Sequence, residues 1–395
     1  MRVLVVANNF PSAVEPQNGI FVLRQIQALH ALGWDTAVAR VIPWAPPLLP
    51  RGQRYRRMPS EYVMDGVPVT VARALFLPGF RSLQYLQRQT APFMRRRVER
   101  FRPHLVHAHG LLPAGTIAAG TGLPFIITGH GSDAYDYPWR GPSLRDVAAR
   151  ALHGADAVVG VSAFISEKLT QLGAANAETV FNGADAGTFY PADRNTARDE
   201  FGIGPQRLVI AFASYILRSK GVYELAEALA GISELNPLLL LAGSGADRPA
   251  LEKKLQESRI EYRAMGVLPH AGLARVFAAS DLVALPTHRE GLPAVVCEAM
   301  LAGRVVVTTP VGGIPEIVRH LETGYVVPVR DPAALMQAFR RLQSDEPLKE
   351  QLERGARAFA AAELTWGANA VKYDRIYRAV LGWTSAQSPG GADCR

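Results

Sequence analysis

The sequence is poor in cysteine: its 395 residues include only Cys297 and Cys394. Two cysteines cannot build a disulfide framework, and neither stands in a spacing that is typical of zinc ligands. This scarcity fits a protein of a reducing compartment, so we expect a cytoplasmic location and no structural metal.

Long apolar runs are also missing. The longest stretch without Asp, Glu, Lys or Arg covers residues 105–132, and prolines and glycines divide it into strand and turn pieces. The opening MRVLVVANNF has an apolar run that is too short for a secretory signal and reads as a first buried strand. We expect no transmembrane helix.

Lysine is scarce, since only six of the 43 basic residues are Lys. Residues 51–102 hold 12 arginines against the three acids Glu61, Asp65 and Glu99. Within this stretch, residues 83–101 mix leucines and aromatics with Arg in a helix-like pattern that Pro92 is expected to interrupt. The stretch could dock on an anionic membrane surface at the inner face of the cell membrane, or it could be a solvated Arg-rich helix packed on a sheet. Nucleic acid is not an expected partner.

Short apolar runs alternate with amphipathic stretches along the chain, which is typical of the α/β class with parallel sheets. The first series of expected strands is 3–7, 36–41, 67–72, 105–107, 125–128, 157–161 and 179–181. The second series is 208–213, 238–242, 262–265, 282–285, 305–308 and 325–327. A helix is expected at 20–32, ended by Gly33.

Two such series predict two doubly wound domains that face each other across a cleft, with the site in the loops after strands. We place the first domain at 1–188 and the second at 189–364. A helix at about 365–383 is expected to pack back on the first domain. Residues 384–395 are rich in Ser, Gly and Pro and are expected to be disordered.

The most informative segment is LVALPTHREGLPAVVCEAMLA, residues 282–302. A strand ends there in a polar loop, and a helix opens near Leu292 and Pro293, so the amides of Gly291 and Leu292 could hold a phosphate. Glu290 and Glu298 lie eight positions apart, on the order of 12 Å along a helix, and would touch different parts of one elongated ligand. The residues alone favour simpler roles. Glu290 would interact with the dipole of the helix that follows it, and Glu298 would be a surface residue.

The same segment, followed by VVTTPVGGIPEIV at 306–318, resembles the sugar-nucleotide motif of the retaining glycosyltransferases of family 4. That family has the GT-B fold, built from two Rossmann-like domains. The resemblance implies that Glu290 lies beside the donor sugar and that Glu298 binds the ribose hydroxyls. It covers about residues 1–383 and is weakest over 43–102.

Other segments carry the same resemblance. SYILRSKG at 214–221 matches the family's diphosphate-binding segment through Lys220, but Tyr215 occupies the place of the usual Arg. Arg218, three residues on, is the candidate substitute. The G-S-G turn of Gly243 and Gly245 resembles the family's turn near the donor base or ribose.

In the first domain, IITGHGSD at 126–133 resembles the family's T-x-H-G segment. The histidine of that segment contacts the donor sugar in the family, so the resemblance implies this role for the matching His130. His109 and Asp133 are secondary candidates, with packing or hydrogen bonding favoured for His109. Asn18 and Gly19 stand where the family usually has two glycines, and Asn tolerates left-handed backbone angles. The dinucleotide fingerprint G-x-G-x-x-G is absent after the first strand, which disfavours an NAD enzyme.

The expected activity is that of a retaining, metal-independent hexosyltransferase that uses a nucleotide diphosphate sugar and needs no cofactor. The NGIFV and RQIQAL segments are similar to those of the subgroup that makes bacterial cell-surface polysaccharides, so the expected acceptor is a polysaccharide or a lipid-linked saccharide. A sugar-nucleotide epimerase or phosphorylase of the same architecture is an alternative. Another is a non-catalytic peripheral membrane protein that binds nucleotides.

Overall fold

The computed structural model describes residues 1–44, 53–75 and 81–383. These residues form two compact units, and each unit is described by itself. Unit 1 comprises Met1–Phe181 together with the chain from Trp366 onward, and unit 2 comprises Asn182–Thr365. The division after Phe181 comes slightly earlier than the expected boundary after residue 188. The expected disordered tail at 384–395 lies outside the described residues.

Within the described residues, unit 1 is built on one sheet of eight strands in the order β3-β4-β2-β1-β5-β6-β7-β8. All neighbours pair in parallel except β3 and β4, which are antiparallel. The strands are β1 (Arg2–Ala7), β2 (Asp35–Trp44), β3 (Glu61–Met64), β4 (Val67–Leu75), β5 (Leu105–His109), β6 (Phe125–Gly129), β7 (Ala157–Gly160) and β8 (Glu178–Thr179).

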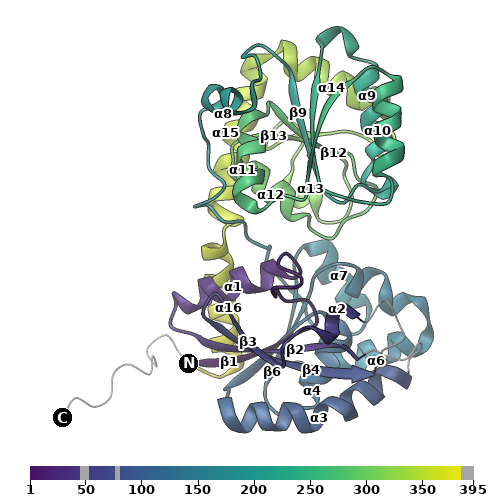
Figure 1. Ribbon diagram of the computed structural model, residues 1–395. Coiled ribbons are helices and arrows are strands. Elements are labelled where there is room, and N and C mark those ends of the chain that lie inside the picture. Colours follow the sequence, from purple (N-terminus) through teal and green to yellow (C-terminus); the bar gives the residue numbers. More distant parts are fainter. Residues whose placement is uncertain (45–52, 76–80, 384–395) are drawn as a thin grey trace, which may run out of the picture. The chain divides into compact units, whose positions relative to one another are not determined.

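Helices cover both faces of this sheet. In Figure 1, α1 and α16 lie on one side of it, and α3 and α4 lie on the other. The α-helices of unit 1 are α1 (Ile20–His30), α2 (Gln53–Arg56), α3 (Arg81–Phe101), α4 (Thr116–Ala119), α5 (Ser132–Tyr135), α6 (Pro142–His153), α7 (Ala163–Gln171) and α16 (Trp366–Val380). The shorter turns are η2 (Leu111–Gly115) and η3 (Tyr137–Arg140).

The returning helix α16 is part of the core of unit 1. Its Tyr373, Ile376 and Tyr377 are buried against strands β1 and β5 and against helix α1. A hydrogen bond also fixes α16 on this unit, because the indole Nε1 of Trp34 donates to Asp374 Oδ1 at 2.8 Å. The last described helix therefore completes a domain that begins at the first residue.

Unit 2 has a parallel sheet, which in the described part of the chain has the order β11-β10-β9-β12-β13-β14. Its strands are β9 (Val209–Ala213), β10 (Leu238–Ala242), β11 (Glu261–Gly266), β12 (Leu282–Leu285), β13 (Val305–Thr308) and β14 (Tyr325–Val326). Its helices and short turns are α8 (Arg194–Phe201), η4 (Arg218–Lys220), α9 (Val222–Ala230), η5 (Ser233–Leu235), α10 (Arg248–Glu257), α11 (His270–Ala279), α12 (Ala294–Leu301), α13 (Ile314–Ile317), α14 (Pro332–Ser344) and α15 (Glu346–Glu363).

One expectation from the sequence is wrong, and one strand was missed. Pro92 does not interrupt α3, which is continuous from Arg81 to Phe101 because Leu86, Thr90 and Met94 keep one face of the helix buried. The edge strand β3 was not expected. It is short, antiparallel and half exposed, so it lacks the continuous apolar run that marks a buried parallel strand.

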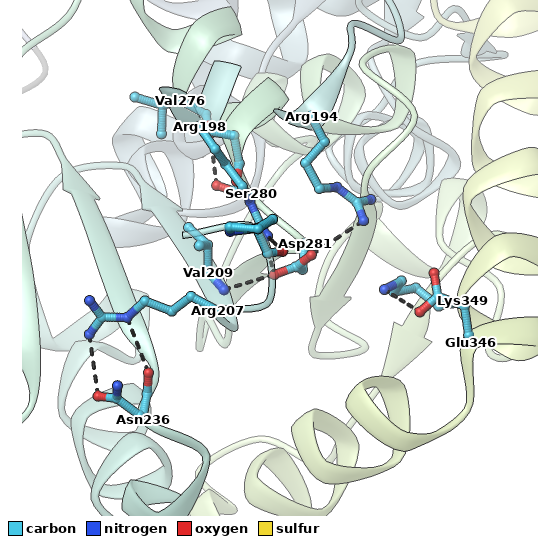
Figure 2. Close-up of polar contacts among 12 residues, drawn as sticks. Arg194, Arg198, Arg207, Val209, Asn236, Val276, Ser280, Asp281, Glu346 and Lys349 are labelled. Carbon is cyan, nitrogen blue, oxygen red and sulfur yellow. Dashed lines mark hydrogen bonds and ion pairs between the residues drawn. The ribbon is translucent and has the colours of Figure 1, made fainter. Parts of the chain in front are cut away.

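A buried ionic cluster fastens α8 to the sheet of unit 2. Figure 2 shows the guanidinium groups of Arg194 and Arg198 directed toward Asp281, which lies just before β12. Arg198 Nη2 lies 2.7 Å from Asp281 Oδ2, and Arg194 Nη1 lies 3.3 Å from Asp281 Oδ1. The same carboxylate accepts a hydrogen bond from the Val209 amide at 2.8 Å. Only 2% of Arg198 and 6% of Asp281 are exposed, so each charge depends on the other.

None of the described helices is long and apolar enough to cross a membrane.

Replacing Asp281 with Ala should destabilise unit 2 strongly, because it leaves the Arg198 guanidinium buried without its carboxylate. Breaking a buried pair costs about 3–5 kcal/mol of unfolding free energy. Glu261→Ala is the matched control, since Glu261 pairs with Arg207 at 2.7 Å but is half exposed, where such a pair contributes about 1 kcal/mol or less. Urea unfolding of both variants measures the difference. Equal losses would show that burial of the cluster adds nothing.

Candidate functional site

The loops that follow β9 and β12 start at the topological switch point of unit 2. These two strands are neighbours in the sheet, but the chain leaves β9 for β10 on one side and leaves β12 for β13 on the other. Ligands of open parallel sheets bind beyond the carboxyl ends of strands at such a point. The two loops, residues 214–221 and 286–293, contain most of the site residues that the sequence predicted for the second domain.

An ion pair joins the two loops. Lys220 Nζ lies 2.5 Å from Glu290 Oε1, and both side chains are largely but not fully buried. The pair is formed by residues 70 positions apart in the sequence. The structure thus brings together two of the three residues predicted as catalytic, and it places them at the carboxyl edge of the sheet.

Backbone contacts hold the loops in this arrangement. Gly221 has a φ of +72°, and a Cβ at this position would lie 1.9 Å from the carbonyl oxygen of Pro286. The absent side chain therefore allows the loop after β9 to contact the end of β12. The His288 amide also donates to the Ser219 carbonyl at 2.8 Å. Lys220 and Glu290 are close because their backbones are fixed on both sides.

The loop after β12 has further supports. His288 Nε2 lies 3.1 Å from Glu224 Oε1 on α9, and the Gly313 amide donates to the Gly291 carbonyl at 2.7 Å. Gly291 and Leu292 are buried directly before α12, which begins at Ala294. These residues therefore lie at the start of a helix, where backbone amides and the helix dipole favour an anion.

Glu298 occupies the buried face of α12 rather than the protein surface. It is 8% exposed, and burial raises the pKa of its carboxyl group to about 7. The ring of His270, at the first position of α11, lies with Nε2 3.6 Å from Glu298 Oε1. The alternative of a surface role for Glu298 is therefore wrong, and its carboxyl group changes charge near neutral pH.

Arg218 and Tyr215 lie in the loop after β9. The guanidinium carbon of Arg218 lies 5.1 Å from the centre of the Tyr223 ring, and Tyr223 in turn donates from its hydroxyl to Asp247 at 2.9 Å. Arg218 is exposed and so is Tyr215, of which 70% is accessible. A cation is thus present next to Lys220, in the same short turn η4.

Gly243 and Gly245 have a packing role in the structure. A Cβ at Gly243 would lie 1.9 Å from the Ser214 carbonyl oxygen, and one at Gly245 would lie 2.1 Å from the Ile216 carbonyl oxygen. The turn after β10 thus packs backbone to backbone on the loop that leads to Lys220. This close approach explains both glycines without any ligand, and donor contact by them stays a prediction.

In unit 1, the residues after β5 and β6 form a second cluster. His109 Nδ1 lies 3.0 Å from His130 Nε2, and the two rings are stacked. Burial lowers the pKa of His130 to about 4 against the opposing effect of Asp133, and burial also lowers the pKa of His109. Both imidazoles are therefore neutral at physiological pH. Asp133 accepts from the backbone amides of His130, Gly131 and Leu111, which fixes the loop.

The loop after β1 is held by a buried ion pair that the sequence did not reveal. Glu15 Oε2 accepts from Arg40 Nη2 at 2.7 Å and from the Asn18 amide nitrogen at 3.2 Å. Gly19 follows with a φ of +70°, and a Cβ there would lie 2.3 Å from the Asn9 carbonyl oxygen. Gly19 is thus required by the loop, whereas Asn18 is tied to Glu15 through its side chain.

No group of three or more His, Cys, Asp or Glu side chains that could hold a metal ion is found in residues 1–44, 53–75 and 81–383.

Family models match both units. The model of glycosyl transferases group 1 matches residues 193–359, and that of the glycosyl transferase 4-like domain matches residues 19–183. A D-inositol 3-phosphate glycosyltransferase of Actinosynnema mirum is 31% identical over 282 residues, which are 64% of this chain and 67% of that protein. The chain belongs to the GT4-type glycosyltransferases.

Another relative of this glycosyltransferase is TuaC of Bacillus subtilis, a glycosyltransferase assigned to teichuronic acid biosynthesis. It is 26% identical over 392 residues, covering 96% of this chain and 99% of TuaC. Among solved structures, sucrose-phosphate synthase from Thermosynechococcus elongatus has a TM-score of 0.81 at 21% identity and covers 97% of this chain and 99% of that one. Anabaena HepE in complex with UDP has a TM-score of 0.75 at 19% identity, with 96% and 100% covered. The glycosyltransferase therefore has the GT-B fold.

Several residues beside the predicted site of this glycosyltransferase were missed. His288 and Glu224 brace the loop of Glu290, and His270 approaches Glu298. Their partners lie far away in the sequence, so no local spacing could have linked them. The HAHG segment offered a signal for His107, because alternate residues of a strand face the same side and a second polar side chain there is unusual.

Replacing Glu298 with Gln should change how stability depends on pH. A carboxyl group whose pKa is raised from 4.5 to about 7 binds its proton more tightly in the folded state. Its contribution to stability is therefore greatest below about pH 4.5 and falls as pH rises toward 7, by about 3 kcal/mol in all. Glu298→Gln should be more stable than the wild type at pH 8 but not at pH 4.5. Chemical denaturation at both pH values measures the unfolding free energy of each protein. The same difference between the two proteins at both pH values would contradict the prediction.

Proposed function

We propose that this glycosyltransferase transfers a hexosyl group, with retention of configuration, from a nucleoside diphosphate sugar to an acceptor hydroxyl, and that it needs no metal or other cofactor. The observation that carries the proposal is the Lys220–Glu290 pair at the switch point of unit 2. One cation and one carboxylate, held together where the sheet favours a ligand, suit a diphosphate joined to a sugar.

In this proposal the positive groups around the loops bind the donor diphosphate. Lys220 is the main cation, Arg218 is the second, and the amides of Gly291 and Leu292 add the partial charge of a helix N-terminus. Arg218 thus replaces the cation that Tyr215 cannot supply. Glu298 would accept hydrogen bonds from the ribose hydroxyls through its buried carboxyl group, whose Oε1 lies 3.6 Å from His270 Nε2.

The reaction would break the bond between the anomeric carbon and the diphosphate oxygen and form one between that carbon and the acceptor oxygen. The acceptor proton would pass to the leaving diphosphate oxygen on the same face of the sugar. Lys220 and the helix amides would stabilise the charge on the leaving group. Glu290 would position the sugar, and His130 is proposed as the unit 1 residue that contacts it.

Relatives suggest the substrate classes. HepE has been crystallised with UDP and with UDP-glucose, and TuaC is assigned to teichuronic acid biosynthesis. We therefore infer a nucleotide-sugar donor and a polysaccharide or lipid-linked acceptor for this protein. Bacterial surface polysaccharide or glycolipid synthesis would place it in the cytoplasm, at the inner face of the membrane.

Helix α3 is the proposed contact with the membrane. Arg88, Arg95, Arg96 and Arg100 are exposed on it, and Tyr85 is half exposed near its start. Cations near an anionic lipid surface contribute about 1 kcal/mol each, so this face could hold the protein at a membrane without an inserted helix.

Lys220→Met and Glu290→Gln should have opposite effects on binding of a nucleoside diphosphate. Loss of the ammonium group should weaken binding of UDP about 10- to 100-fold, because hydrogen bonds to charged groups are lost. Loss of the carboxylate charge should leave UDP binding equal or tighter, since Lys220 no longer has a competing anion. Turnover should fall at least about 100-fold in both variants. Calorimetry and a donor-consumption assay measure these effects.

The control for these variants is Lys254→Met, a half-exposed residue of α10 in the same unit. UDP is used first, with GDP and ADP in parallel. Wild-type nucleotide affinity in Lys220→Met for every nucleotide bound by the wild type would contradict the phosphate role. An epimerase would instead convert the donor sugar with no acceptor present, which product analysis detects.

Arg95→Gln combined with Arg96→Gln should reduce binding to anionic vesicles. Two cations near the surface account for about 2 kcal/mol, or more than tenfold in partitioning. Flotation with vesicles of phosphatidylglycerol and phosphatidylcholine measures the effect, and higher salt should weaken the wild type. Lys253→Gln with Arg354→Gln, both exposed in unit 2, is the control. Equal flotation of the two double variants, or no flotation of the wild type, would rule out α3 as the contact.

A further inference from the structure

A strip of polar side chains lies buried on one face of the sheet in unit 1. His107 and His109 alternate on β5 and so share a face, and Thr128 on β6 pairs in register with His109. Tyr373 and Tyr377 of α16 cover the strip. All these side chains are buried, in a place where a parallel sheet covered by helices normally has only apolar residues.

His107 is held at both ring nitrogens. Its Nδ1 lies 2.7 Å from the Tyr377 hydroxyl, and its Nε2 lies 2.7 Å from Thr128 Oγ1, which itself lies 2.8 Å from the Tyr373 hydroxyl. Burial lowers the pKa of His107 to about 3, so the ring is neutral. A neutral imidazole has one donor and one acceptor, so the two hydroxyls that contact it must play opposite roles. The ring cannot rotate without breaking a buried hydrogen bond.

Ring contacts continue from this point to the predicted substrate-binding histidine. The rings of His107 and His109 have centroids 4.1 Å apart, and His109 is bonded to His130. His130 also packs against Phe21, with ring centroids 4.6 Å apart. A continuous column of rings thus connects α16 with the loop after β6, and every member that could be charged is neutral.

Packing alone does not account for the hydroxyls. Phe would fill the space of Tyr377 without the cost of burying a polar group, and an apolar residue at His107 would need no partners. The polar atoms serve instead to fix one orientation of His107, on which the ring of His109 packs.

We propose that Tyr377, with His107, Thr128 and Tyr373, is a positioning residue for His130. Through the ring column, α16 sets the orientation of the His109–His130 pair before any ligand binds. The inference rests on the proposed function, in which His130 contacts the donor sugar.

The pair that is positioned in this way has a defined chemistry. Two neutral imidazoles share one N–H between His109 Nδ1 and His130 Nε2. His109 Nε2 and His130 Nδ1 have no hydrogen-bond partner within the part of the chain that the structure describes. One of these two atoms must carry a proton and the other a lone pair. The role of the buried His130 Nδ1 as donor or acceptor is therefore coupled to the tautomer of His109.

The test uses Tyr377→Phe, which removes only the hydroxyl group, and Ile376→Val as the control on the same buried helix face. In the full chain labelled with 15N-histidine and without ligand, Tyr377→Phe should shift the ring nitrogens of His107 and of His130, whereas Ile376→Val should not. Unchanged His130 nitrogens in Tyr377→Phe would overturn the proposal. This measurement does not depend on any activity.

Kinetics test the consequence. Tyr377→Phe should lower kcat about 5- to 10-fold with little change in the donor KM. Ile376→Val should lower the unfolding midpoint about as much as Tyr377→Phe does, but it should leave kcat unchanged. In a His130→Ala background, Tyr377→Phe should have no further effect on kcat. Independent, multiplying effects of the two substitutions would overturn the positioning role. If His130→Ala alone leaves turnover unchanged, the sugar contact in the proposed function fails, while the nitrogen shifts still report on the column.

Discussion

Parallel strands that start and end together bring every loop that follows them to the same edge of a sheet, and this constraint organises both units. In unit 2 it places the loops after β9 and β12 side by side, so that Lys220 and Glu290 meet although they are far apart in the sequence. In unit 1 it places His109 and His130 at the ends of neighbouring strands. The strand order, rather than any single motif, decides which side chains become neighbours.

The side chains at these two sheet edges differ in charge. The edge of unit 2 keeps an intact ion pair and an exposed guanidinium group, and its buried Glu298 titrates near neutrality. The edge of unit 1 holds neutral imidazoles, because burial makes protonation of His109 and His130 unfavourable. A charged edge suits an anionic ligand such as a diphosphate, whereas neutral donors and acceptors suit hydroxyl groups. In the proposed function, the charged edge of unit 2 would bind the diphosphate.

Much of the fold could be predicted because buried parallel strands have short continuous apolar runs in the sequence. All strands expected from such runs are present, whereas β3 escaped because it is half exposed and antiparallel. Pro92 misled the expectation for α3, since the burial of three residues outweighs one missing backbone hydrogen bond. The site residues were found through motif resemblance, but their partners were not. Tyr377 lies 270 positions from His107, and only the folded chain shows that they touch.

In the proposed function, Lys220 and Glu290 together receive a diphosphate-linked sugar. A crystal structure of the protein grown with UDP-glucose, or with whichever sugar nucleotide gives the largest thermal shift, tests it most directly. We expect a diphosphate oxygen within hydrogen-bonding distance of Lys220 Nζ and the sugar beside the Glu290 carboxylate, with the ribose at Glu298. A nucleotide bound elsewhere, with the Lys220–Glu290 pair intact and no ligand beside it, would contradict the account.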